Sequence, residues 1–280
     1  MIEIKNIGHF CRTDSRGHII NDSSINAIKP EFKYIIDAVI ETYQSYLGEH
    51  LHSVYIRGSI PRGLGIDNVS DLDTIAITNI NIDAIDLNWV DKAEQALNEN
   101  FKEVDGVELS FYFIEDILET TNFSIIPFMI KTHSICVYGK DISVFLPNYK
   151  ADKTLANEHL VNLRSQIQQA KEELTGNEDV EDVLDCCRWI MKIIVRAGLA
   201  LVLVEENRYT RDLYPAYKLF SEHFPSKESE MKQALEYAVN PISNSEVIIN
   251  FLNELGEWMI SITEKWLQVY NPNMERNMKI

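Results

Sequence analysis

The chain has 280 residues, of which 45% are hydrophobic, and a formal net charge of −17 at pH 7. This length can form one large or two ordinary domains with a substantial buried core. This negative charge disfavours a nucleic-acid partner, because proteins bind nucleic-acid phosphates with basic surfaces. It suits a cationic ligand, but it is equally consistent with a charge that serves only solubility. We expect no membrane contact and a cytoplasmic location, because the most apolar segment, 190–204, contains Lys192 and Arg196 and no apolar signal core begins the chain.

The first half of the chain predicts helices and strands in alternation. Apolar residues spaced three and four apart indicate helices, while short runs of β-branched and aromatic residues indicate strands. In chain order the sequence predicts a helix over 30–47, a strand over 51–56, a Gly-Ser turn with a short helix, a strand over 70–77, a helix over 86–101 and a strand over 104–114. These elements predict a mixed sheet covered by helices.

The segment from Gly58 to Asp73 combines a glycine turn with two carboxylates. Gly58 allows the close approach of a ligand, and Ser59 supplies a hydroxyl and a backbone N–H at a helix start, where phosphate binds. Asp71 and Asp73 alternate along the next strand, so we expect both carboxylates on one side. Two such anions repel unless a cation lies between them, and Mg²⁺ prefers these oxygens. The segment therefore predicts a phosphate site with a divalent metal.

Glu108 is a carboxylate in a strand whose other residues suit the interior of a sheet. A charge in such a place needs a partner or a function. Glu108 would either belong to the acidic site of Asp71 and Asp73 or pair with a buried arginine. Ser70 is in turn either a phosphate ligand or a plain turn residue.

From residue 150 onward the pattern is almost wholly helical. One predicted helix carries Arg188, Lys192 and Arg196 at intervals of four, which places them in one basic stripe. The stripe either pairs with acids such as Asp185 or binds a polyphosphate. The sequence predicts a bundle of four or five helices, with helices over 150–174, 178–206, 212–224, 226–239 and 244–269.

A family resemblance lies in the order of these features. Gly58-Ser59, an eleven-residue gap, Asp71-Leu72-Asp73 and the later Glu108 resemble the nucleotidyltransferase superfamily related to DNA polymerase β. The whole chain is similar to bacterial aminoglycoside adenylyltransferases of the streptomycin and spectinomycin type. This resemblance implies an α+β fold, with a polymerase-β-like catalytic domain in residues 1–149 and an all-α bundle in residues 150–280 that closes over the nucleotide.

The same resemblance implies roles for individual residues. Asp71 and Asp73 would hold two Mg²⁺ ions, and Glu108 would complete a metal site or accept the proton of the attacking hydroxyl. Arg211 stands where the family has a lysine, and the drug-binding residues of the family are not carried over. The residues assigned to the nucleotide are Gly58, Ser59, Ser70, Arg62, Lys192, Arg196 and Arg211.

The implied reaction is transfer of a nucleoside monophosphate, AMP from ATP, to a hydroxyl group with release of pyrophosphate. The expected acceptor is a small cationic molecule such as an aminoglycoside-like compound. Two alternatives remain open. One is transfer to a macromolecule, a protein or a tRNA end, as in toxin–antitoxin systems. The other is a nucleotide-binding module without transfer.

Overall fold

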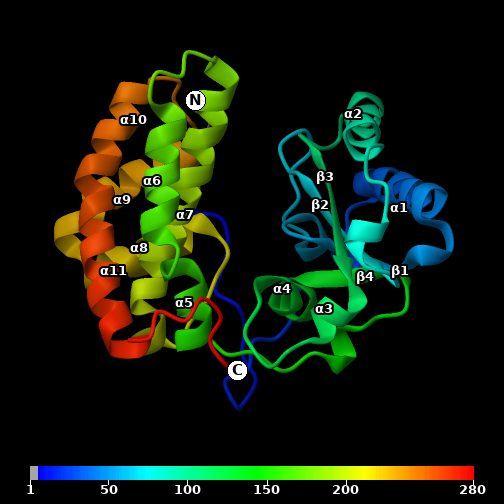
Figure 1. Ribbon diagram of the computed structural model, residues 1–280, viewed down its shortest axis with the longest axis horizontal. Coiled ribbons are helices and arrows are strands. Elements are labelled where there is room, and N and C mark those ends of the chain that lie inside the picture. The colour runs from blue at the N-terminus through cyan, green and yellow to red at the C-terminus, as the bar shows by residue number, and fades with distance from the viewer. Residues whose placement is uncertain (1–5) are drawn as a thin grey trace. The chain divides into compact units, whose positions relative to one another are not determined.

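The computed structural model describes residues 6–280 and has an α+β fold, as the sequence predicts. The chain divides into two compact units (Figure 1). One unit is Ile19–Tyr149, which contains the sheet, and the other joins Lys150–Ile280 to the described part of Met1–His18. The assignment of 1–149 and 150–280 as functional domains remains a proposal.

The first unit is built on a mixed sheet of four strands in the order β3-β2-β1-β4. The central strands β1 and β2 run antiparallel, β4 pairs antiparallel with β1, and β3 pairs parallel with β2. Both central strands are almost wholly buried, in keeping with their continuous apolar sequences. The strands are β1 Leu51–Arg57, β2 Leu72–Thr78, β3 Val107–Phe113 and β4 Ser134–Gly139.

Helices cover both faces of this sheet, and the alternation of side chains along each strand decides which residues each face receives. Val54, Ile56 and Ala76 belong to the apolar cluster that includes α1 and α2. Tyr55 and Ile75 belong to the other cluster, which includes residues of α3 and α4. The helices are α1 Lys33–Leu47, α2 Val90–Asn100, α3 Ile114–Leu118 and α4 Ile125–His133.

The first unit differs from the prediction in three places. The helix predicted from residue 30 begins with a 3₁₀ turn, Pro30–Phe32, before α1. The helix expected after the Gly-Ser turn is a single 3₁₀ turn, Ile60–Arg62. The helices α3 and α4 and the strand β4 lie in a part of the sequence for which we predicted no element. The other 3₁₀ turns here are Ile25–Ala27, Gly48–His50, Ile82–Ala84 and Ser143–Phe145.

The second unit is a helical bundle arranged around α7 (Figure 1). Asp179 caps the start of α7 by accepting hydrogen bonds from the backbone N–H groups of Glu181 and Asp182. Asn207 ends it in the left-handed conformation, at φ 52°. The bundle contains α5 Lys153–Leu160, α6 Leu163–Leu174, α7 Val180–Glu206, α8 Leu213–His223, α9 Glu228–Val239, α10 Ser245–Phe251 and α11 Glu257–Tyr270, with a 3₁₀ turn at Pro225–Lys227.

Two of the predicted long helices have a different internal structure. The helix expected over 150–174 is divided into α5 and α6, although Leu160 and Leu163 on either side of the break are both buried. The helix expected over 244–269 contains a π-helical segment, Leu252–Gly256, between α10 and α11. Within residues 6–280, no helix is long and apolar enough to cross a membrane.

Residues 6–18 belong to the same compact unit as the helical bundle. Cys11 donates its backbone N–H to the carbonyl of Tyr209 at 2.7 Å. Thr210 donates its hydroxyl to the carbonyl of His9 at 2.8 Å. These contacts hold the segment before Arg211.

Candidate functional site

A row of charged residues crosses three neighbouring strands at one end of the sheet. Arg57 is the last residue of β1 and pairs in register with Asp73 on β2. Asp73 pairs in turn with Glu108 on β3. By strand alternation, Arg57 follows Tyr55 and Asp73 precedes Ile75 on the face that α3 and α4 cover. The register therefore brings together an arginine and two carboxylates that lie far apart in the sequence.

One guanidinium nitrogen contacts both carboxylates. Arg57 Nη2 donates a hydrogen bond to Glu108 Oε2 at 3.1 Å and lies 3.3 Å from Asp73 Oδ1. Ser110 donates its hydroxyl to Glu108 Oε1 at 2.8 Å. The pairing of Glu108 with an arginine, which the sequence left as an alternative, is thus present, and it occurs beside Asp73.

The pKa values of the two carboxyl groups are shifted in opposite directions. Burial raises the pKa of Asp73 to about 6; Arg57 opposes this rise, and the negative charges of Glu108 and Asp71 add to it. Burial also acts to raise the pKa of Glu108, but Arg57 and the hydrogen bond from Ser110 outweigh it and leave that pKa below its ordinary value. Glu108 is the more exposed of the pair, so it keeps its charge more readily.

Gly58 and Gly106 leave room for the acidic side chains. Gly58 has a φ of +91°, and a Cβ there would lie 2.8 Å from Asp73 Oδ2. A side chain at Gly106 would place its Cβ 3.6 Å from Asp71 Oδ1. Asp71 precedes β2 and is exposed. Its carboxylate therefore extends toward the turn before β3 and is near enough to influence the charge of Asp73.

The predicted serines lie next to each other. Ser59 donates its hydroxyl to the hydroxyl of Ser70 at 3.1 Å, and Ser70 accepts the backbone N–H of Ile66 at 2.9 Å. Arg62 and Leu64 donate their backbone N–H groups to the carbonyl of Ser59. The loop thus folds back from Gly58 toward β2 and places both hydroxyls near its base. A 3₁₀ turn of three residues adds only a small dipole, so the helix-start argument from the sequence is weakened here.

Arg62 has a structural partner within the sheet unit. Its Nε lies 3.0 Å from Asp22 Oδ2, and the side chains of Arg62 and Asp22 are only 6% and 10% exposed. The turn is further fixed by a hydrogen bond from the backbone N–H of Ser24 to the carbonyl of Pro61. A nucleotide role for Arg62 would have to coexist with this ion pair.

The basic residues predicted for the triphosphate all lie in the helical unit. Lys192 and Arg196 are on α7, one turn apart, and Arg211 precedes α8. Loss of water around its ring and the positive charges of Arg196 and Arg211 lower the pKa of His159 to about 3, which places the two arginines near one imidazole. Arg188, the first member of the basic stripe, pairs with Asp185 at 2.7 Å.

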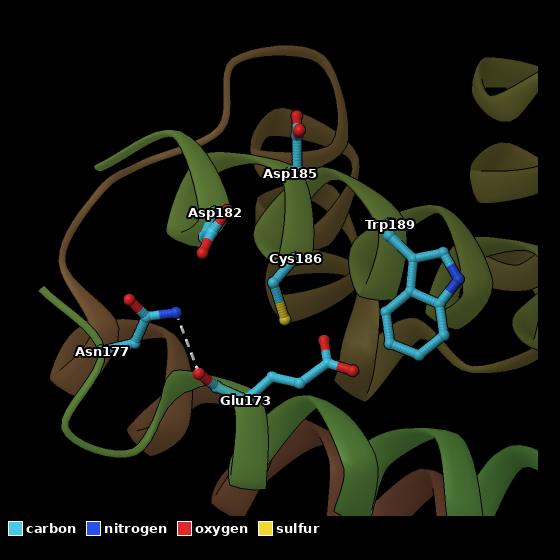
Figure 2. A pocket seen from close by; sticks show the side chains of 6 residues that line it. All are labelled: Glu173, Asn177, Asp182, Asp185, Cys186 and Trp189. Atoms are coloured by element: carbon cyan, nitrogen blue, oxygen red, sulfur yellow. Dashed lines mark hydrogen bonds between the residues drawn. The ribbon is translucent and has the colours of Figure 1, made fainter. Parts of the chain in front are cut away.

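An acidic hollow of about 390 Å³ lies where α6 ends and α7 begins (Figure 2). Figure 2 shows the side chain of Glu173 extending below Cys186 toward the indole of Trp189. Burial, followed by the charge of Glu173, raises the pKa of the Cys186 thiol to about 12, so this thiol is neutral. Carboxylates beside an aromatic face suit a cation. The lining residues are Glu173, Asn177, Asp182, Asp185, Cys186 and Trp189.

The carboxylates fit a divalent cation in charge and in ligand type. Asp73 and Glu108 already share one positive group, the guanidinium of Arg57, and carboxylate oxygens are the ligands that Mg²⁺ takes. Asp71 would add a third carboxylate. Among residues 6–280, however, no three His, Cys, Asp or Glu side chains are gathered closely enough to hold a metal ion by themselves. The remaining ligands would have to come from a substrate or water.

No protein-family model and no curated protein matches this chain. Among solved structures, the chain is similar to a spectinomycin adenyltransferase from Enterococcus faecialis, which was solved with ATP and spectinomycin. The two share 15% sequence identity at a TM-score of 0.43, over 80% of this chain and 98% of the other. A likeness of this degree carries no functional argument, so the function must be argued from the residues of this chain.

The sequence analysis assigned no part to Arg57. A usable signal was present. Arg57 ends a strand in which Tyr55 and Arg57 share one face, and it is a charge at the end of an apolar run. What the sequence lacked was the register that sets this arginine opposite Asp73.

Proposed function

We propose that the protein is a Mg²⁺-dependent nucleotidyltransferase that transfers AMP from ATP to a hydroxyl group of a small cationic acceptor. The observation that carries this proposal is the pairing in register of Asp73 with Glu108, beside the turn of Gly58 and Ser59. Two carboxylates at the end of a sheet, next to a glycine turn and two hydroxyls, suit a metal-bound polyphosphate.

In the proposed reaction, the acceptor hydroxyl attacks the α-phosphorus of ATP. The bond from the α-phosphorus to the bridging oxygen breaks, pyrophosphate leaves, and the proton of the hydroxyl passes to a carboxylate or to water. Asp71, Asp73 and Glu108 would hold Mg²⁺, which supplies neutralisation of charge on the triphosphate. The lowered pKa of Glu108 keeps it ionised near neutral pH, as either a metal ligand or a proton acceptor requires.

Basic residues of the helical unit are proposed to bind the triphosphate. Arg196 and Arg211 both act on the charge of His159, and Lys192 lies one turn before Arg196. Arginine binds phosphate through paired hydrogen bonds, so the replacement of a lysine by Arg211 keeps the charge and adds donors. Arg188 is left out, because its guanidinium pairs with Asp185.

The cationic character of the acceptor is supported by the overall charge of −17, which would attract such an acceptor. We therefore place aminoglycoside-like amines first among the acceptors to be tested.

The test is release of pyrophosphate from MgATP in the presence of single acceptors drawn from aminoglycosides, aminocyclitols and polyamines. We expect release only with a hydroxyl-bearing amine and only with a divalent cation. Transfer of labelled AMP to a protein or a tRNA, with none to any amine, would replace the small acceptor by a macromolecule. Failure to bind ATP at all would refute the proposal.

A further inference from the structure

Arg57 lies where a cation would neutralise Asp73 and Glu108. Its side chain is 18% exposed, against 25% for Asp73 and 54% for Glu108. Both of these ion pairs use the same nitrogen, Nη2. The pairing of their strands fixes the backbones of the three residues side by side, so the two carboxylates arise from neighbouring positions of the sheet. A positive group at this position therefore stabilises the folded sheet by neutralising part of the charge of the two carboxylates.

The charges at the site are unequal. Asp71, Asp73 and Glu108 supply three negative charges when ionised, and Arg57 supplies one positive charge. A single nitrogen, Arg57 Nη2, contacts both Asp73 and Glu108, so one positive charge is shared between two carboxylates. A divalent cation would neutralise the carboxylates further, but it would have to take the oxygens that the guanidinium now contacts, because two positive groups at one oxygen pair repel each other.

We propose that Arg57 is a built-in competitor of the divalent cation, so that the metal is held weakly until a polyphosphate binds. This inference rests on the proposed function. A polyphosphate changes the balance in two ways: it brings further oxygen ligands for the cation, and it offers the guanidinium a new anionic partner. Metal and nucleotide then bind cooperatively. Arg57 is a positioning residue that couples the two binding events.

The experiment measures Mn²⁺ binding by electron paramagnetic resonance, with and without a non-hydrolysable ATP analogue. The variant Arg57→Gln removes the charge but keeps a polar side chain of similar length. Without nucleotide, we expect it to bind Mn²⁺ about tenfold more tightly than the natural protein, the lower end of what close charge pairs contribute. The gain in Mn²⁺ affinity that the nucleotide analogue produces should shrink by a similar factor.

Two further variants test whether the effect is specific to Arg57 and whether the added Mn²⁺ is bound by Glu108. Arg164→Gln removes an arginine that pairs with Glu264 on the bundle, and it should leave Mn²⁺ binding unchanged. In the double variant Arg57→Gln with Glu108→Gln, the gained affinity should disappear. If Arg57→Gln does not fold, Arg57→Met is measured instead; it also removes the charge, and its Mn²⁺ affinity should likewise exceed that of the natural protein.

The outcomes separate this inference from the function on which it rests. Mn²⁺ affinity in the Arg57 variants that equals or falls below that of the natural protein overturns the competition. If the single variant Glu108→Gln, measured in parallel, weakens Mn²⁺ binding in that case, the metal site of the proposed function stands. Absence of Mn²⁺ binding in every variant, with and without the nucleotide analogue, overturns both.

Discussion

Replacing Asp73 by Asn should stabilise the protein at alkaline pH, because a carboxylate at this position is costly when ionised. Its pKa rises from 3.8 to about 6 in the folded chain. At 1.36 kcal/mol per pH unit, this rise corresponds to a cost of about 3 kcal/mol for the ionised group. Asparagine has nearly the same shape and no charge, so it removes this cost while keeping the packing beside Gly58.

The sign of the pH dependence follows from the direction of the shift. A carboxyl group whose pKa is raised by folding favours the folded state fully below pH 3.8, and this contribution is lost as the pH rises through about 6. Between pH 5 and pH 8 the loss amounts to about half of the total, or roughly 1.4 kcal/mol. The stability of Asp73→Asn minus that of the natural protein should therefore increase by about 1.4 kcal/mol over this range.

The assay is urea unfolding at pH 5 and pH 8 with a chelator present, followed by circular dichroism. Taking the difference between the two proteins at each pH cancels the other titrating groups. Asp37→Asn, on the exposed face of α1, controls for the loss of one negative charge. A difference that stays constant or decreases from pH 5 to pH 8 would falsify the argument that Asp73 is a strained carboxylate.

Further predictions concern the glycine turn, the carboxylate of β3 and the arginines. Gly58→Ala should lower the free energy of unfolding by about 1–3 kcal/mol, measured in urea, because of its positive φ and the approach of Asp73 Oδ2. Glu108→Gln should reduce AMP transfer at least about 100-fold while ATP binding, measured by calorimetry, changes much less. Arg211→Gln should weaken ATP binding about tenfold or more, since each charged contact to phosphate contributes 1.5–3 kcal/mol as a rule. Arg188→Gln, which removes a guanidinium paired with Asp185, should leave ATP affinity nearly unchanged, and equal effects of the two arginine variants would contradict this assignment.

The sequence predicted elements whose patterns are local. The apolar periodicity of α1 and α7 and the compact apolar run of β1 placed these elements within a few residues of their bounds. The break between α5 and α6 was missed, because no glycine or proline occurs between Lys153 and Leu174 to mark it. Apolar residues continue through that break, so their period alone could not reveal it.

The candidate site was predictable only where its residues stand out in the local sequence. Glu108 was found because a carboxylate in an apolar strand is visible in the sequence, but its closeness to Asp73 was expected only through the family resemblance. The contact with Arg57 depends on the register of β1 against β2 and could not be read from the chain. The pairing of Arg62 with Asp22 was hidden for the same reason, since Asp22 lies in a stretch without any pattern.

The most direct test of the central claim is a single-turnover measurement of AMP transfer from labelled ATP with Mg²⁺ and an amine acceptor. The natural protein should release pyrophosphate and form an acid-stable AMP adduct in equal amounts. Asp73→Asn, folded and more stable at pH 8, should form neither. Equal transfer by Asp73→Asn and the natural protein would contradict the assignment of the paired carboxylates of β2 and β3 as the site of the reaction.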